Sequence, residues 1–545
     1  MANALYYGDN LDVLRESIAS ESVDLVYLDP PFNSQANYNV LFKGPSGKMA
    51  DAQIEAFEDT WHWGEGAERA FSEVLASPYT QAAELLRAMR SFLGENDVMA
   101  YLAMMAVRLL ELHRVLKPTG SLYLHCDPTA SHYLKLLLDA IFAKENFLNE
   151  IIWKRTSAHN SAKRFGPVHD TIFFYSKSEQ HIWNTAFQPI PQETIDAWYN
   201  NIEAGTDRRF NRADLTAPGI RAGSSGTPWR GISPTAKGRH WAIPGFLGLQ
   251  SKDTPEALDE LDAAGRLHWP KRGGMPMFKR YLDESTGTPA QDVITDIAPL
   301  NNSATERLGY PTQKPLELLE RFIHASSNEG DLILDPFCGC GTTIHAAQKL
   351  GRAWIGIDVT HLAISLIERR LKDAFPGIAF EVHGTPKDLE SALDLAARDK
   401  YQFQWWAVSL VEARPYGGKK KGADGGIDGI LFFRSDKDKT EKALVSVKGG
   451  DNVGVGMVRE LISVVDREKA AIGVLISLAL PTRVMEREAS AAGLYETPFE
   501  KVPKIQIITL AELFQGIRPR IPRIDVGATF RTAARERPDV QGRLL

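Results

Sequence analysis

Short apolar runs alternate with amphipathic stretches in residues 1–154 and again in residues 306–398. Each run is rich in Leu, Ile, Val and Tyr, which is typical of a buried parallel strand. The runs predict strands at Ala4–Tyr7, Val23–Leu28, Ser121–His125, Ile151–Trp153, Leu332–Leu334 and Ala353–Ile357. The amphipathic stretches predict helices at Leu11–Ile18, within residues 79–116, and at Ala130–Phe142, Leu316–Ser326 and Ile344–Leu350. Alternating strands and helices indicate an α/β, doubly wound, Rossmann-like sheet.

The alternation stops near Lys154 and resumes near Gly309, and a second, smaller α/β pattern begins near Tyr401. Glycine, proline, arginine and tryptophan dominate the intervening stretch, so we expect an insert there. The last residues are rich in Arg and Pro, which predicts a poorly ordered tail. We therefore expect five parts, at residues 1–154, 155–305, 306–398, 401–516 and 517–545.

Composition narrows the class of protein. The 545 residues are 43% hydrophobic and 24% charged, as in an ordinary globular chain. No apolar run reaches the ~18–20 residues that span a bilayer, and the N-terminus lacks a signal-peptide layout, so no membrane partner is expected. Cys126, Cys338 and Cys340 do not make a disulfide framework, which favours a cytoplasmic location. Close packing explains the Cys338–Cys340 pair better than a metal site does.

The stretch Leu332–Thr343, LILDPFCGCGTT, joins a strand, an acid, a turn of small residues and the start of a helix. Its glycines let the backbone pass close to a ligand. The following helix N-terminus offers free N–H groups to an anionic group. The next strand ends in Asp358, and an acid about 20 residues after such a turn typically binds ribose hydroxyls. The stretch therefore predicts a nucleoside-cofactor site.

A second motif, Asp29-Pro30-Pro31-Phe32, ends the predicted strand Val23–Leu28. A carboxylate there can accept a hydrogen bond from an exocyclic amine, and a proline-fixed backbone can turn a carbonyl toward the same amine. The aromatic ring that follows can stack on a planar base. A simple strand-ending turn is the alternative, but the motif is unusual after an apolar strand.

Together with GDN at Gly8–Asn10 and GYPTQKP at Gly309–Pro315, these motifs resemble those of beta-class DNA amino-methyltransferases over about residues 4–375. The catalytic motif precedes the cofactor motif, which is the circularly permuted beta-class order. The resemblance implies S-adenosylmethionine as methyl donor, double-stranded DNA as substrate, and a target-recognition insert at residues 155–305. It also implies a cofactor-binding set: Asp9, Thr312, Gln313, Lys314, Asp335, Phe337, Gly339, Gly341, Thr342 and Asp358. In that set Asp335 and the turn line the methionine part, Lys314 lies beside its carboxylate, Asp358 holds the ribose, and Asp9 lies near the adenine.

The mechanism expected from this resemblance flips the target base out of the duplex. Asp29 and the Pro30 carbonyl hold the amine, Pro31 shapes the turn, and Phe32 stacks on the ring. The amine then attacks the methyl group directly, without a covalent enzyme intermediate. Asp as the first residue of the motif resembles adenine-N6 enzymes more than cytosine-N4 enzymes, and the cytosine-N4 alternative stays open.

The insert carries a local positive charge in a chain whose net charge is −6. Residues 151–240 hold 12 Lys and Arg against 7 Asp and Glu, so 12 − 7 = +5. Phe210, Trp229 and Trp241 interleave with these basic residues, as phosphate contacts and base stacking require. An ordinary arginine-rich surface is the alternative. The candidate DNA-binding residues are Arg208, Arg209, Arg212 and Arg230.

Residues 401–516 contain a third set of candidate site residues. An acid before one strand and a lysine at the end of the next can share a metal and a water, as in phosphodiester hydrolysis. The stretch resembles an Mrr-like endonuclease domain of the PD-(D/E)XK superfamily, which implies a Mg²⁺ site with Asp428 as metal ligand and Lys448 as catalytic lysine. Ser446 and Gln404 stand where that superfamily has acidic or amide ligands. Metal-dependent cleavage and a degenerate, DNA-binding domain are therefore both open.

Three further classes of protein are each compatible with parts of the pattern. They are a fused restriction–modification enzyme, a non-catalytic DNA-binding protein, and a methyltransferase acting on RNA or a small molecule. The recognition sequence cannot be derived, because no code maps the insert onto bases. A homodimer is neither required nor excluded.

Overall fold

The computed structural model describes most of the chain, and the structural statements below concern those residues alone. They are 3–31, 39–43, 49–55, 63–156, 165–245, 249, 253–270, 274–301, 304, 306–308, 313–416, 426–436, 439–450, 452–497, 500–522 and 535–536. Phe32, Thr312, Lys419–Lys421 and most of the predicted tail 517–545 lie outside this set.

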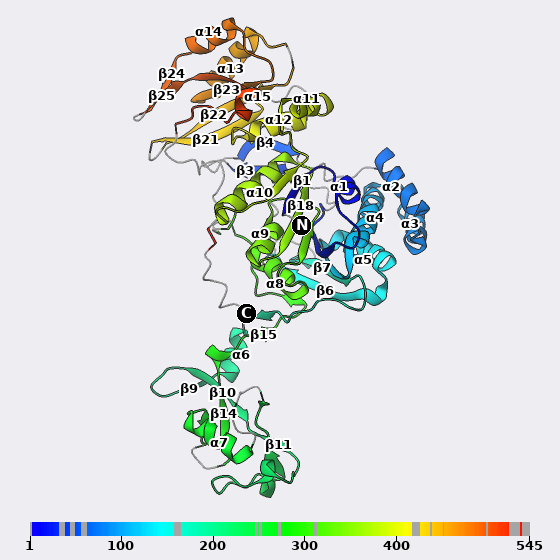
Figure 1. The fold of residues 1–545 in the computed structure, drawn as a ribbon, viewed down its shortest axis with the longest axis vertical. Coiled ribbons are helices and arrows are strands. Elements are labelled where there is room, and N and C mark those ends of the chain that lie inside the picture. The colour runs from blue at the N-terminus through cyan, green and yellow to red at the C-terminus, as the bar shows by residue number, and fades with distance from the viewer. Residues whose placement is uncertain are drawn as a thin grey trace. The chain divides into compact units, whose positions relative to one another are not determined.

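A nine-stranded sheet dominates the larger of two compact units, which comprises residues 1–184 and 291–538 (Figure 1). Its strand order is β16-β6-β7-β5-β2-β17-β18-β1-β19. β7 runs antiparallel to β5 and β6, and the other neighbouring strands pair in parallel. The strands are β1 (Ala4–Tyr7), β2 (Val23–Leu28), β5 (Leu116–Cys126), β6 (Phe147–Lys154), β7 (His169–Ser176), β16 (Val293–Ile294), β17 (Leu332–Asp335), β18 (Ala353–Asp358) and β19 (Glu381–His383).

Helices cover both faces of this sheet, which confirms the predicted doubly wound α/β class. Successive residues of β17 point to opposite faces of the sheet. Leu332 and Leu334 belong to one hydrophobic core, and Ile333 belongs to the other. The first core packs α1 (Asn10–Ser17), α2 (Glu65–Ala76), α3 (Thr80–Leu93), α4 (Asp97–Val115) and α5 (Pro128–Phe142). The second packs α8 (Leu316–Ser326), α9 (Thr342–Lys349) and α10 (His361–Ala374).

Three local expectations were wrong. The stretch Lys117-Pro118-Thr119-Gly120 has the composition of a turn, yet it lies inside β5, where the pairing with β2 shifts register between Val23 and Leu25. The polar and aromatic composition of residues 33–66 indicates a loop, yet this stretch contains a hairpin, β3 (Asn39–Lys43) and β4 (Met49–Glu55), and the first residues of α2. The stretch after Lys154 was expected to be irregular, yet β7 lies there and joins the large sheet. Short apolar runs such as TIFFYS are hard to separate from loop sequence by periodicity alone.

Of the predicted insert, Thr185–Ala290 forms the second compact unit. Its largest sheet has the order β13-β14-β10-β9, and a small core lies against α7. The elements are β8 (Phe187–Gln188), α6 (Gln192–Trp198), β9 (Asn201–Ile202), β10 (Arg209–Asp214), β11 (Thr216–Pro218), β12 (Arg239–Trp241), α7 (Thr254–Ala263), β13 (Leu267–His268), β14 (Met277–Tyr281) and β15 (Thr288–Pro289). Phe210, Trp229 and Trp241, expected to stack on bases, are 4%, 4% and 2% exposed. That expectation was wrong, because a unit this small needs its aromatic side chains for its own core.

The C-terminal residues form a separate five-stranded sheet with the order β20-β21-β22-β23-β26. Its strands are β20 (Arg414–Pro415), β21 (Gly429–Asp436), β22 (Lys439–Lys448), β23 (Ile472–Ser477) and β26 (Ile505–Thr509), with a hairpin of β24 (Leu494–Glu496) and β25 (Lys501–Pro503). The helices are α11 (Leu389–Arg398), α12 (Lys400–Ser409), α13 (Val455–Arg467), α14 (Arg483–Ala491) and α15 (Leu510–Phe514). Cores on both faces of the sheet make this a small α/β domain.

Two expected absences can be compared with the described residues. Cys126, Cys338 and Cys340 are buried free thiols. None of the described helices combines the length and the apolar character that a bilayer crossing requires.

We predict that Asp24, at the start of β2, stabilises the sheet. Its carboxylate is 5% exposed, binds Lys117 Nζ at 2.8 Å and accepts a hydrogen bond from Leu332 N at 2.9 Å. Asp24→Ala leaves a buried N–H unpaired and should lower the free energy of unfolding by about 2 kcal/mol. Asp24→Asn keeps an acceptor for Leu332 and should cost about half as much. Urea unfolding measures both, and equal costs would contradict the assignment.

Candidate functional site

Four neighbouring strands end at one edge of the large sheet, and each end carries a predicted motif. β2 pairs with β17 (Val26 opposite Leu334), β17 with β18, and β18 with β1. Because parallel strands end on the same side, Asp29, Asp335, Asp358 and the Gly8–Asn10 turn meet there. The catalytic and cofactor motifs, far apart in sequence, are thus brought together.

The small-residue turn after β17 has the backbone that only glycine accommodates easily. Gly339 and Gly341 have φ of 48° and 73°, in the left-handed region. A Cβ on Gly341 would lie 2.7 Å from Ile367 Cγ1. Gly341 also begins α9 without a side-chain cap, so the helix N-terminus keeps N–H groups for a ligand.

Two acids at this edge are almost fully buried. Asp335 is 3% exposed, and burial, with the charges of Asp29 and Asp358 adding to it, raises its pKa to about 7. Asp358 is 4% exposed, and burial raises its pKa to about 6 although Thr360 and Gly339 donate hydrogen bonds to it. Buried acids with raised pKa values are typical of functional sites.

Hydrogen bonds fix the Gly8–Asn10 turn to the end of β18 and to the turn that follows β17. Gly8 N donates to the Asp358 carbonyl at 3.0 Å, and Asn10 Nδ2 donates to the Pro336 carbonyl at 2.8 Å. The buried Arg108 of α4 donates to both Asp9 oxygens at 2.9 and 3.0 Å and to Asn10 Oδ1 at 2.6 Å. Sequence reasoning missed Arg108, since nothing near it in the chain marks it as a partner of Asp9.

Arg370 of α10 is a second residue that sequence reasoning missed. Its side chain is 3% exposed, and Nη1 donates to the Cys340 carbonyl and to Thr342 Oγ1, both at 3.1 Å. Its Nε donates to His345 Nδ1 at 3.1 Å. Arg370 therefore holds the turn against α9.

The predicted catalytic and helix-leading motifs meet through a salt bridge. Lys314 Nζ donates to Asp29 Oδ2, and the two side chains are 13% and 20% exposed. Gln313 anchors the same segment by accepting from Leu308 N at 2.8 Å and donating to the Glu306 carbonyl at 2.6 Å. Pro30 is buried and Pro31 partly buried, while Phe32 and Thr312 lie outside the described residues.

A buried polar chain lies beside Asp29. Tyr27 Oη hydrogen-bonds His125 Nδ1 at 2.8 Å, and His125 Nε2 hydrogen-bonds Asp170 Oδ2 at 3.0 Å. Arg155 Nε lies 3.2 Å from the other Asp170 oxygen. Burial lowers the pKa of His125, and the nearby charge of Lys314 adds to this, so the imidazole stays neutral at pH 7. These hydrogen bonds hold Tyr27 in place, near the end of β2 that leads into Asp29.

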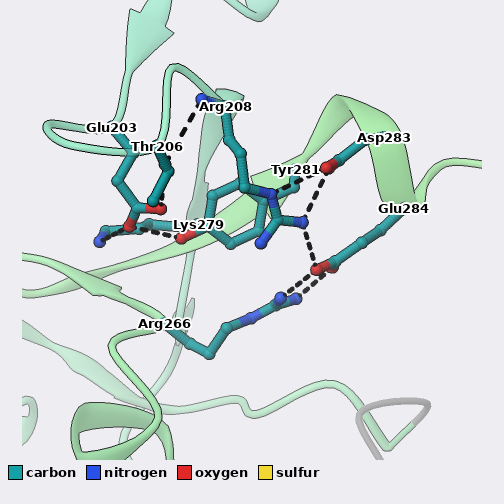
Figure 2. Close-up of polar contacts among 8 residues, drawn as sticks. All are labelled: Glu203, Thr206, Arg208, Arg266, Lys279, Tyr281, Asp283 and Glu284. Atoms are coloured by element: carbon teal, nitrogen blue, oxygen red, sulfur yellow. Dashed lines mark hydrogen bonds and ion pairs between the residues drawn. The ribbon is translucent and has the colours of Figure 1, made fainter.

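In the insert unit, Arg208 lies in a network of ion pairs (Figure 2). It donates to Asp283 twice at 2.8 Å and to Glu284 at 2.8 Å. Its guanidinium lies 3.8 Å from the centre of the Tyr281 ring. These contacts join β10 to the segment after β14, so Arg208 stabilises the unit.

The remaining candidate DNA-binding arginines differ in their partners. Arg209 pairs with Asp196 at 3.5 Å, and Arg230 pairs with Asp259 at 3.1 Å. Arg212 is exposed on β10, with no acidic partner among the described residues. The role of these arginines in DNA binding stays a prediction, and the geometry favours Arg212.

In the C-terminal domain Asp428 lies beside the strand that ends in Lys448. Asp428 is 9% exposed, accepts from Val447 N at 2.6 Å, and lies 3.4 Å from Ser446 Oγ. Glu460 of α13 lies near Gly426, two residues before Asp428: its Oε1 lies 3.2 Å from the point that a Cβ on Gly426 would occupy.

The described residues contain no group of three His, Cys, Asp or Glu side chains that could hold a metal ion. Mg²⁺ does not require one, since it is commonly held by one or two carboxylates with water and substrate phosphates. The Asp428 carboxylate, beside the end of β22, is one carboxylate of that kind.

Comparison with known proteins identifies relatives of the first domain. The chain is 36% identical over 272 residues to the type II methyltransferase M.EcaI of Enterobacter cloacae, covering 50% of this chain and 57% of that protein. It is 40% identical over 370 residues to the type II methyltransferase M.BamHI of Bacillus amyloliquefaciens, covering 68% and 57%. It is 24% identical over 373 residues to the DNA adenine methyltransferase YhdJ of Escherichia coli K12, covering 68% and 83%. The chain thus spans little more than half the length of M.EcaI and M.BamHI.

Two protein families match along the chain. Residues 395–515 match the Mrr-type catalytic domain described as a restriction endonuclease, as the resemblance predicted. Residues 23–369 match the N6/N4 DNA methylase family. The Rossmann-like fold, the motif order and this match agree, and the chain belongs to the N6/N4 DNA methylase family, with an Mrr-type endonuclease domain at its C-terminal side.

Proposed function

We propose that this protein transfers a methyl group from S-adenosylmethionine to the exocyclic amine of a flipped base in double-stranded DNA. One observation carries the proposal: Asp29 and the DPFCGCGTT turn lie at the ends of the neighbouring strands β2 and β17. An amine held at Asp29 then faces a cofactor held at the turn. Family membership supports DNA as the substrate.

The residues at the turn suit the parts of the cofactor. The uncapped start of α9 suits a carboxylate, and Asp335 suits a cationic ammonium. Asp358 suits ribose hydroxyls, and Gly339 and Gly341 leave room for close approach. S-adenosylmethionine supplies an electrophilic methyl group when bound. On the strength of the family resemblance, the proposed cofactor-binding set also includes Asp9, Thr312, Gln313, Phe337 and Thr342.

On the target side, Asp29 accepts a hydrogen bond from the amine and the Pro30 carbonyl accepts a second. This orients the nitrogen lone pair toward the methyl group, so positioning supplies most of the rate.

Asp29 as the first residue of its motif favours adenine N6 as the target. Cytosine N4 is the alternative, and sequencing the modified bases in DNA from a host that expresses the protein distinguishes the two.

A second candidate function, metal-dependent DNA cleavage, is favoured by the endonuclease match and by Asp428 beside the end of β22. Asp428 would hold Mg²⁺, which polarises a phosphodiester and activates a water. Lys448 would neutralise developing charge. The fused restriction–modification enzyme requires both activities in one chain.

Asp29→Ala should lower methyl transfer to DNA at least about 100-fold, because the amine loses its acceptor. Binding of S-adenosylhomocysteine should stay within about threefold, since the cofactor turn is unchanged. A tritiated-methyl assay and calorimetry measure the two. Retained methyl transfer would refute the assignment of Asp29.

Cofactor affinity should depend on pH through Asp335, whose pKa is raised to about 7. A bound ammonium favours the carboxylate, so below pH 7 a proton must leave on binding. Affinity for S-adenosylhomocysteine should therefore fall about tenfold from pH 8 to pH 6. Asp335→Asn should remove this dependence, and the exposed control Glu16→Gln should keep it. An unchanged pH dependence in Asp335→Asn would contradict the role.

Asp428→Ala should weaken Mn²⁺ binding, read by calorimetry, and abolish metal-dependent cutting of unmethylated DNA. Lys448→Ala should abolish cutting but leave Mn²⁺ binding within about threefold, because its ammonium is not a ligand. Lys442→Ala, which removes a pair with Glu468, is the matched control. Cutting that survives Asp428→Ala would exclude this site.

A further inference from the structure

Lys314 lies between the two halves of the proposed site. Its ammonium pairs with Asp29 Oδ2, and both side chains are largely buried. Burial raises the pKa of Cys340 in the turn after β17, and the charges of Arg370 and Lys314 oppose this rise. Burial lowers the pKa of His125, and the charge of Lys314 adds to that effect. Lys314 is therefore within electrostatic reach of both motifs.

The segment that carries Lys314 is held in place on both sides. Gln313 has backbone partners at Leu308 and Glu306, and Pro315 begins α8 with φ of −59°. A lysine on such a segment loses less entropy when it forms an ion pair than one on a mobile loop. The ion pair between Lys314 and Asp29 is therefore a well-supported contact at this edge of the sheet.

Asp29 lies among other ionisable side chains, and their charges determine the effect of Lys314 on its carboxylate. Asp335 faces it from β17, Tyr27 precedes it on β2, and Asp170 and His125 lie on neighbouring strands. A carboxylate among other buried carboxylates is repelled, and the ammonium of Lys314 offsets this repulsion. With Oδ2 bound to Lys314, Asp29 Oδ1 has no partner among the described residues and can accept the target amine.

We infer that Lys314 is a positioning residue for methyl transfer: it orients the Asp29 carboxylate and leaves one oxygen for the amine. This goes beyond the family resemblance, which implies only a place beside the methionine carboxylate. The inference rests on the proposed function.

The test separates the rate of transfer from cofactor affinity. Lys314→Met should lower kcat for DNA methylation by about 30-fold or more at saturating cofactor, and Lys314→Arg should recover part of it. The dissociation constant of S-adenosylhomocysteine should change by less than about threefold. A tenfold loss of cofactor affinity with unchanged kcat would overturn the inference in favour of a pure cofactor ligand.

Lys117→Met is a matched control, because Lys117 pairs with Asp24 at the opposite end of β2. It should lower stability without changing kcat. Urea unfolding of Lys314→Met, Asp29→Asn and the double variant tests the ion pair without any activity. The effects should be non-additive, and strictly additive effects would overturn the inference even if no DNA is methylated. Failure of the wild-type protein to methylate DNA would instead overturn the proposed function.

Discussion

The parallel pairing of β2 with β17 is the constraint on which the rest of the first domain depends. Val26 lies opposite Leu334, so the residues that follow each strand leave the sheet side by side. No loop length or surface charge needs to bring the two motifs together, because the backbone ladder does so. The circularly permuted order of the two motifs in the sequence therefore does not change the geometry of the site. It changes which loops connect the strands, and it leaves the edge itself intact.

This arrangement concentrates negative charge, and the fold offsets it locally. Asp335 and Asp358 are nearly fully buried, and burial raises the pKa of each. Backbone N–H groups of the turn satisfy their oxygens, as Gly339 N does for Asp358. Cations lie behind them: Arg108 at Asp9, Arg370 at the turn and Lys314 at Asp29. A site built this way costs stability in the resting protein, which is the usual exchange at functional sites.

Much of this could be predicted from the sequence, and the failures have physical causes. The bounds of β1, β2 and α8 were predicted correctly, since apolar runs or amphipathic periodicity mark them. The site motifs were found because glycine, proline and acid have local conformational signatures. Arg108 and Arg370 were missed, because an interior arginine acquires its partners only when distant segments meet. The same holds for Trp229 and Trp241: composition could not show that these side chains are the core of their own unit.

The insert shows why a charge count over a sequence window misleads. The excess of +5 in residues 151–240 includes Arg208 and Arg230, whose acidic partners Asp283 and Asp259 lie beyond the window. A guanidinium held by carboxylates contributes little potential at a distance, because the pair is nearly neutral. Under the proposed function, attraction to phosphates would come from unmatched side chains such as Arg212. Arg208 acts differently: its ion pairs with Asp283 and Glu284 hold together two segments of a unit with a small core (Figure 2). Under the proposed function, specificity follows from what that unit presents to the groove, and net charge alone does not measure it.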